Sequence, residues 1–326
     1  MERSFALSLT GKEWWKPFIV YWIVFLLFYV FILTLQYLSP GLLKHPVMYF
    51  LLVLVATFVI VADQAVFTIV AYRIALPRLK LAEQSFAFRG AVGRYLGMTL
   101  LGMLLSVVTL TIYMPWYIRR ITAYLVGEVS YDGASPEFLS RGGKLLVYFL
   151  LALWLPVIVI SVLIGLVVGF TAKSGQLGNG GGLQLLTTLL TFIIFLLMIP
   201  FFYFFYKWYV NLRWKESVIR WVTRFWPSVG FILGQVLLTL ITFGIYWPAA
   251  ALRMFRYFAG KTAVSKGDVE VGRFAFTGSI GKGFGLIWGQ TLLSIITIGF
   301  YLPWGLARIG CWILEECKYR TGAAQA

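Results

Sequence analysis

Four long apolar runs constrain this chain more than any other feature. Each is long enough, at about 20 residues, to cross the hydrocarbon core of a bilayer as a helix. The runs cover residues 17–38, 47–72, 145–170 and 183–206. Because 60% of the residues are hydrophobic and 12% are charged, a soluble core could not bury so much apolar surface. The sequence therefore predicts an all-α polytopic membrane protein.

The segment before the first run and the net charge of the chain refine this prediction. The segment before residue 17 lacks a short apolar core followed by a small-residue cleavage site, so we expect the first run to be an anchor and not a removable signal. The net charge is +16. Basic residues beside membrane segments account for it. We therefore expect the lipid bilayer and its anionic phospholipids as partners, and no nucleic acid.

One stretch of the chain is repeated. Residues 86–116 align with residues 274–304 without a gap, and 13 of the 31 positions are identical. A further copy lies at residues 219–249. Repetition at this level is evidence for one structural unit that is used several times. We expect three related helix units, each broken at a proline.

Each copy carries hydroxyl side chains on one helix face. The spacing i, i+3, i+7 places a serine or threonine, a threonine and a tyrosine together. As candidates for an ion or solute path, these residues are Ser106, Thr109, Tyr113, Thr239, Thr242, Tyr246, Ser294, Thr297 and Tyr301. A proline then removes a backbone donor, which predicts a break in the helix. The predicted breaks are Pro115, Pro248 and Pro303.

Glycines and arginines recur around these faces. Glycines at four-residue spacing predict close contact between helix backbones in lipid. They are Gly93, Gly97, Gly230, Gly234, Gly281, Gly285 and Gly289. Five residues after each proline comes an arginine, whose long side chain can extend to lipid headgroups. These predicted headgroup contacts are Arg120, Arg253 and Arg308.

Polar segments separate the units. Residues 261–278 alternate apolar and polar side chains around a Lys-Gly-Asp turn, which predicts a small β-hairpin at the cytoplasmic membrane surface. Residues 127–143 are a looser copy. We therefore divide the chain into five parts. They are a spanning hairpin that is a diverged unit (1–80), a repeat unit (81–144), a second spanning hairpin (145–210), a repeat unit (211–260), and a repeat unit with the C-terminal tail (261–326).

At these residues the chain resembles the YjgN-like family of bacterial inner-membrane proteins. The shared features are an aromatic-x-aromatic-x-Gly entry, a Thr-x-Gly-x-Tyr-x-Pro-Trp string and an arginine-rich exit, over residues 81–170 and 215–320. Ala249 replaces the expected tryptophan, and Thr111 replaces the expected glycine. The resemblance implies an inner-membrane location and a fold type. It implies no activity, because the family's function is itself unassigned.

The basic residues favour one arrangement of the units. If all three units crossed the membrane, Lys and Arg would divide 15 to 13 between the two sides. If each unit returns to the side from which it enters, 26 of 28 lie on one side, and only Lys44 and Lys173 lie on the other. Basic residues concentrate on the cytoplasmic side. We therefore predict four spans and three re-entrant or interfacial units, with both termini in the cytoplasm.

Two functions stay open. In a transporter or channel-like protein, the hydroxyl faces would line a polar path, and Asp63, an acid near mid-bilayer, would couple to a proton or ion. In a non-transporting protein, the basic face would organise anionic lipid or a cytoplasmic partner. Hydroxyl faces also join membrane helices to one another, which fits the second function as well as the first.

Enzymatic chemistry has little support in the sequence. We find no nucleophile with a base, no metal set and no carboxylate dyad. The chain has a single histidine, His45, and Cys311 and Cys317 are six residues apart, which matches no metal or redox spacing. We therefore expect no enzymatic activity, no cofactor and no metal, and we leave a homo-oligomer open.

Overall fold

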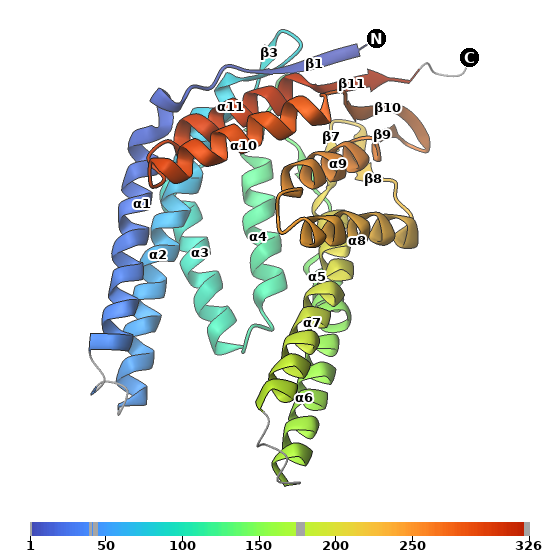
Figure 1. Cartoon of the computed structure of the whole chain (residues 1–326). Helices are drawn as coiled ribbons and strands as arrows, with labels where there is room; N and C mark the ends of the chain where they lie inside the picture. Colours follow the sequence, from blue (N-terminus) through green and yellow to red (C-terminus); the bar gives the residue numbers. More distant parts are fainter. Residues whose placement is uncertain (1, 39–40, 42–44, 174–179, 323–326) are drawn as a thin grey trace.

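The computed structural model describes residues 2–38, 41, 45–173 and 180–322. Long helices extend away from a layer of strands, and the first and last described segments of the chain lie in that layer (Figure 1). The α-helices are α1 (Gly11–Leu33), α2 (Pro46–Ala75), α3 (Val92–Val108), α4 (Met114–Gly127), α5 (Gly142–Tyr148), α6 (Leu155–Lys173), α7 (Gly180–Tyr209), α8 (Phe225–Ile241), α9 (Trp247–Ala259), α10 (Ile280–Ile296) and α11 (Leu302–Glu315).

Four helical segments in the described residues are long and apolar enough to cross a bilayer. They are Gly11–Tyr37, Pro46–Arg78, Gly142–Phe170 and Thr188–Tyr209. They form two pairs, α1 with α2 and α6 with α7. These are the places where the sequence predicts spans, and the chain is a membrane protein with four candidate spans. Lys44 and the side chain of Lys173, the two basic residues predicted on the far side, lie outside what the structure describes.

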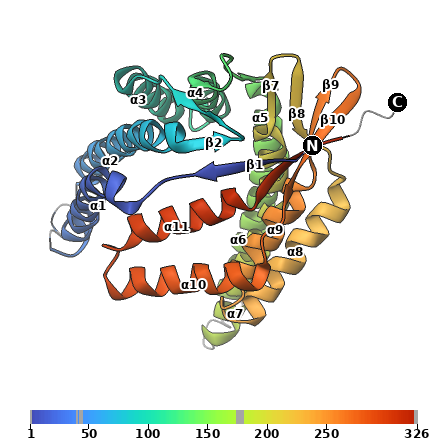
Figure 2. The ribbon, with the colours of Figure 1, turned by 90° about the horizontal axis from the view of Figure 1, so that it is seen from above.

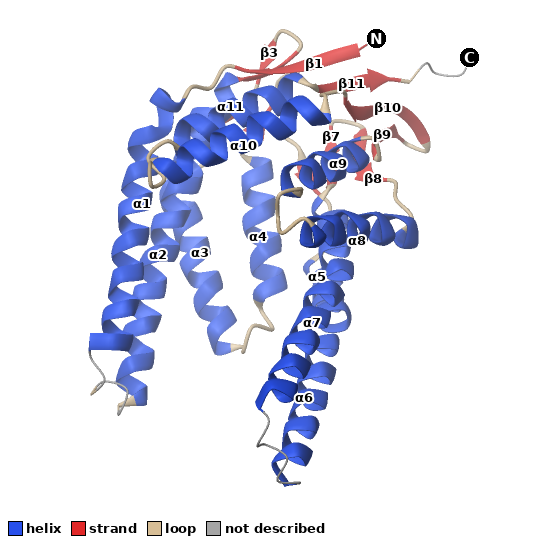
Figure 3. Cartoon of the chain, in the orientation of Figure 1, coloured by secondary structure: helices blue, strands red, loops and turns tan. Residues whose placement is uncertain are grey.

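The strands gather at one end of the helices (Figure 3). Nine of them form one antiparallel sheet in the order β3-β2-β1-β11-β10-β9-β8-β7-β6, and β4 pairs with β5. Their bounds are β1 (Glu2–Leu7), β2 (Leu79–Leu81), β3 (Gln84–Ser85), β4 (Ala87–Phe88), β5 (Val129–Ser130), β6 (Glu137–Phe138), β7 (Asn211–Trp214), β8 (Ser217–Trp221), β9 (Thr262–Lys266), β10 (Val269–Phe276) and β11 (Cys317–Thr321).

The sheet corrects the all-α prediction. The hairpin expected at 261–278 forms as β9 and β10, but it is one part of a larger sheet and does not stand alone. In the looser copy at 127–143, β5 and β6 do not pair with each other, because β5 pairs with β4 and β6 with β7. The strands at the two chain ends pair as well, with Glu2 opposite Arg320. Pairing satisfies backbone groups that separate hairpin edges would leave open.

The buried core sits where the helices meet the sheet. One apolar cluster joins α9, β10, α10 and β11, and includes Leu252, Phe276 and Cys317. Two others join α2 to α3, and α5 and α7 to β6. Burial raises the pKa of the Cys317 thiol to about 11, so this cysteine is an inert packing residue at neutral pH. Away from this core, many apolar side chains of the long helices are exposed, as expected for surfaces that contact lipid.

Candidate functional site in the three helical hairpins

Each repeat unit folds as a helical hairpin. The first hairpin is α3–α4, the second is α8–α9 and the third is α10–α11. In each one a 17-residue helix precedes a second helix of 13 or 14 residues. The first hairpin runs beside α2, and the other two lie across the long helices close to the strands (Figures 1 and 2). The first helices fall short of the length of the four candidate spans.

The chain reverses in each unit, but not at the prolines. The first helices end at Val108, Ile241 and Ile296. Pro115, Pro248 and Pro303 lie in the first turn of the second helices. A proline is well placed there, because first-turn N–H groups have no partner inside a helix. The breaks are therefore the turns 109–113, 242–246 and 297–301, and the predicted positions are corrected accordingly.

The three turns satisfy their own polar groups in the same way. In the third hairpin, the Thr297 hydroxyl donates to the Leu293 carbonyl at 2.8 Å and accepts from the Tyr301 backbone N–H at 3.1 Å. The Gly299 N–H donates to the Ser294 carbonyl at 2.7 Å. Thr109 and Thr242 make the equivalent bonds. A turn inside hydrocarbon needs such hydrogen bonds within itself, because no water is present there to bond to its polar groups.

An apolar side chain projects from the tip of each turn. The exposed fractions are 82% for Leu110, 96% for Phe243 and 82% for Ile298. All three residues have a positive φ, which turns the side chain away from the hairpin. Apolar side chains exposed at three equivalent tips are a liability in water, whereas lipid covers them without cost. The turns are therefore suited to insertion into a bilayer.

The predicted path residues bond within their own hairpins. Ser106, Thr239 and Ser294 each donate to the carbonyl four residues earlier, at 2.7–2.8 Å. The Tyr246 and Tyr301 hydroxyls each donate to a glutamine of the same hairpin, at 3.0 and 2.9 Å. These bonds occupy the hydroxyls locally instead of directing them into a shared channel. A polar path through the three hairpins stays a prediction.

The first hairpin differs from the other two at one pair of facing positions. Gln235 and Gln290 correspond to Gly102, while the small residues Ala250 and Gly305 correspond to Tyr117. In the third hairpin the two positions face each other, because a Cβ added at Gly305 would lie 3.3 Å from the Gln290 side chain. A Cβ added at Gly102 would lie 2.1 Å from the Tyr117 ring. The tyrosine ring therefore fills the space that the glutamine takes in the other copies. Neither position is unusual by itself. The paired change of a glutamine to glycine and of a small residue to tyrosine could be found in the sequence only by comparing both positions across the three copies.

The recurring glycines do not make the close contacts that their spacing predicts. A Cβ added at any of them would meet nothing within 4 Å. They are Gly93, Gly97, Gly230, Gly234, Gly281, Gly285 and Gly289. Close packing occurs instead at Gly102 and at Gly283, where the added Cβ would lie 2.4 Å from Trp312. Spacing alone placed the glycines on one helix face, but the neighbouring helices pack elsewhere.

The three hairpin arginines are exposed. Arg253 lies over the Tyr246 ring, 5.5 Å from its centroid, and Arg308 Nη1 donates to the Tyr301 hydroxyl at 3.4 Å. Within the described residues, no carboxylate forms an ion pair with Arg120, Arg253 or Arg308. Their positive charges are therefore available to an anion outside the chain.

Asp63 lies on α2, and its Oδ2 atom is buried without a hydrogen-bond partner. Arg73, further along the same helix, donates to the Gly90 carbonyl at 2.8 and 3.1 Å. α2 packs against α3, and on α3 the Thr99 hydroxyl is also buried, within reach of the Tyr117 hydroxyl. Among the described residues, the Oδ2 atom of Asp63 is thus the buried carboxylate oxygen that lacks a hydrogen-bond partner.

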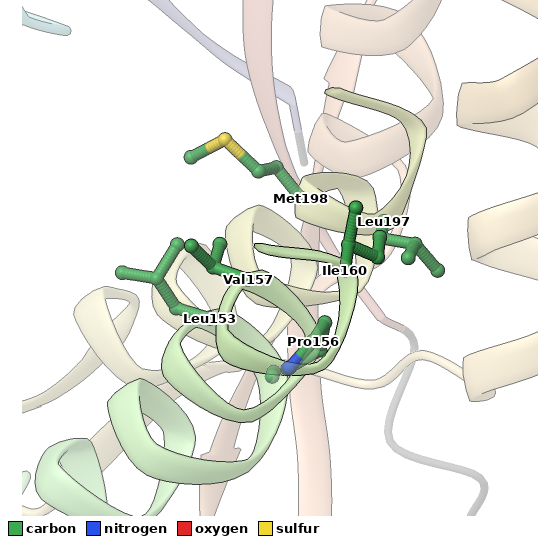
Figure 4. A pocket seen from close by; sticks show the side chains of 7 residues that line it. Leu153, Pro156, Val157, Ile160, Leu197 and Met198 are labelled. Atoms are coloured by element: carbon green, nitrogen blue, oxygen red, sulfur yellow. The ribbon is translucent and has the colours of Figure 1, made fainter. Parts of the chain in front are cut away.

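Hollows lie at several places among the helices. The recess between α6 and α7 is lined by apolar side chains such as Pro156, Ile160 and Leu197 (Figure 4) and has no room for a water molecule. An open groove of about 540 Å³ beside the third hairpin is bordered by Trp22, Trp247 and Ser294. In the described residues no three His, Cys, Asp or Glu side chains come together as metal ligands.

One family model matches the chain twice, over residues 83–204 and 148–270, which together exceed half of its length. The chain belongs to this family. It is described as bacterial proteins of unknown function (DUF898), and two matches within one chain are typical of a repeated unit. The resemblance to YjgN-like proteins stays a prediction. Neither the search of the curated proteins nor that of the solved structures found a match.

The backbone of Thr111, in the turn of the first hairpin, is strained, and two substitutions test this. Thr111 has a φ of 69°, where the other two turns place Gly244 at 85° and Gly299 at 87°. A left-handed conformation costs a non-glycine residue about 1–2 kcal/mol. Thr111→Gly is therefore expected to stabilise the protein by about 1 kcal/mol, and Gly244→Thr to destabilise it similarly. Thermal unfolding in detergent measures both, and equal midpoints for all three proteins would contradict the assignment.

Proposed function

We propose that the protein is a non-transporting, non-catalytic membrane protein that organises anionic phospholipid on the side of the bilayer where its sheet lies. We place that side in the cytoplasm, with both termini. The observation that carries the proposal is the construction of the hairpins. Their turns are apolar at the tip and form hydrogen bonds within the turn. Their arginines are exposed, and no carboxylate among the described residues pairs with them.

The two features act together on a lipid. An apolar turn inserted into one leaflet holds its hairpin at a defined depth, because withdrawing the tip would expose it to water. A basic residue near an anionic surface contributes about 1 kcal/mol of attraction. Arg253 and Arg308 lie on the same hairpins as the tips formed by Phe243 and Ile298. Each hairpin thereby supports an acyl-chain contact and a phosphate contact at once.

Lipid retention tests the proposal. The purified protein is offered equal amounts of phosphatidylglycerol and phosphatidylcholine, and retained lipids are counted by native mass spectrometry. Replacing Arg120, Arg253 and Arg308 with Gln is expected to weaken phosphatidylglycerol retention by about fivefold for each arginine. The matched control replaces three exposed sheet arginines, Arg213, Arg220 and Arg320. Equal losses in the two triple variants, or no preference for the anionic lipid, would refute the role of the hairpins.

Asp63 favours a second candidate, coupled transport of a proton or cation. Its buried Oδ2 has no hydrogen-bond partner among the residues that the structure describes, and an acid inside a membrane is a functional candidate by default. The test is ion flux across proteoliposomes that contain the wild type or Asp63→Asn. Flux that requires the carboxylate would establish transport and overturn the proposal above. Equal, background-level flux in both proteins would leave lipid organisation as the function.

A further inference from the structure

An apolar cavity, open at one side, lies against the sheet, and its lining residues belong to none of the three hairpins. Its volume is about 390 Å³, within the range of about 300–1,000 Å³ that is typical of small-molecule sites. Side chains from β1, β2, β7, β8, β9, β10 and β11 line it. Along β1 the lining residues alternate, Arg3 and then Phe5, as expected for one face of a strand. Figure 2 shows β1 and β2 on one side of this layer and β7 to β10 on the other.

A short segment after β5 closes the sheet around the cavity. The Tyr131 hydroxyl donates to the Leu81 carbonyl of β2 at 3.1 Å, and the Trp214 indole of β7 donates to the Tyr131 carbonyl at 3.3 Å. Beside it, Asp132 forms an ion pair with Lys215 at 2.5 Å. These contacts connect the β2 end of the sheet to the β7 end. The concave face is therefore held around the cavity as a pocket and does not open as a flat surface.

The lining is apolar apart from a few groups. Phe5, Leu79, Phe86, Leu212 and Val264 are typical of it. Its one charged member is Arg3, which is exposed and lies opposite Tyr319 in the strand pairing. The neighbouring Glu2 is paired with Lys318 and Arg320 instead. Arg3 forms no ion pair with a carboxylate in the described part of the chain. The acid whose charge acts on it, Asp132, is itself paired with Lys215, so Arg3 stays available to an anionic ligand beside the apolar cavity.

We propose that this cavity binds one acyl chain that carries an anionic head group. The chain would occupy the apolar interior, and the carboxylate or phosphate would meet Arg3 and the Tyr319 hydroxyl at the rim. Each buried methylene group adds about 0.8 kcal/mol of favourable transfer, and the single cation selects an anionic over a zwitterionic head. A free fatty acid and a membrane phospholipid both provide this chemistry. The site is separate from the hairpin arginines and does not depend on them.

Photolabelling of the whole protein in phosphatidylcholine nanodiscs tests the proposal. The probe is palmitic acid with a diazirine in mid-chain, and labelled peptides are mapped by mass spectrometry. A second arm uses the same chain esterified in phosphatidylglycerol. Labelling is expected on the cavity strands β7, β9 and β10, and excess unlabelled palmitic acid is expected to suppress it. The arm that labels these strands identifies the source of the chain, and labels confined to the helices in both arms would overturn the proposal.

Two variants and a matched control sharpen the result. Arg3→Gln removes the charge and is expected to reduce strand labelling by about tenfold. Arg220→Gln is the control and should leave labelling unchanged. Arg220 is exposed and follows the lining residue Ile219, so it lies on the opposite face of β8. Val264→Phe is expected to fill the cavity and abolish labelling. Circular dichroism shows whether that variant is folded, and Arg3→Gln serves as the test if it is not. Strand labelling that is insensitive to Arg3→Gln would refute the anionic ligand.

Discussion

A cysteine at Phe243, in a protein that lacks Cys311 and Cys317, is expected to resist a membrane-impermeant maleimide from both sides of the membrane. Phe243 is 96% exposed on the protein but lies at the tip of a hairpin, where we expect hydrocarbon to exclude the reagent and to disfavour the reactive thiolate. Labelling is measured in intact spheroplasts, in opened membranes and after denaturation in detergent. Only the denatured protein is expected to react.

Two control cysteines, one expected on each side of the membrane, show that the maleimide reaches both surfaces. Asp268 lies in the exposed turn between β9 and β10, and Gly41 lies exposed between α1 and α2. Asp268→Cys is expected to react once membranes are opened, because it lies in a turn of the sheet. Gly41→Cys is expected to react in intact spheroplasts, because Gly41 lies between the ends of α1 and α2 that point away from the sheet (Figure 1). If Phe243→Cys reacts in intact spheroplasts, the hairpin crosses the membrane. All three units would then be expected to cross the membrane, which gives the chain seven spans instead of four.

Gly102→Gln is expected to destabilise the protein strongly, and Tyr117→Ala is expected to relieve much of that loss. A Cβ at residue 102 would lie 2.1 Å from the Tyr117 ring, and overpacking of this kind costs about 1–3 kcal/mol. Alone, Tyr117→Ala leaves a cavity. The double variant reproduces the two residue types that the second hairpin has at these positions, Gln235 and Ala250. We expect a favourable coupling of about 2 kcal/mol between the substitutions.

Unfolding midpoints of the wild type, both single variants and the double variant form a double-mutant cycle. Gly97→Gln serves as the control, because it lies on the same helix and a Cβ added there would meet nothing within 4 Å. It should change stability little. Additive effects of Gly102→Gln and Tyr117→Ala would show that the two positions do not compensate for each other. A loss from Gly97→Gln as large as that from Gly102→Gln would show that any added side chain disrupts the helix.

The sequence alone determined the features that depend on residues close together in the chain. Apolar runs of spanning length set the four candidate spans, because a helix of about 20 residues is the local solution to crossing hydrocarbon. The repeated string that ends at the proline marked the region where the chain reverses, and in the structure its threonine bonds to both sides of the turn within four residues. The position of the break was wrong by a few residues, because proline suits the first turn of a helix as well as it ends one.

Only the tertiary structure decided how these units meet. Glu2 pairs opposite Arg320 across almost the whole chain, and no short-range pattern specifies which strands become neighbours in a sheet. The glycine spacing identified a helix face but not its partner, so the close contact proved to be at Gly102 and not at Gly97. The cavity needs side chains from strands at both ends of the chain, with Arg3 opposite Tyr319. Such a site exists only after folding, because distant segments must be brought together before it can form.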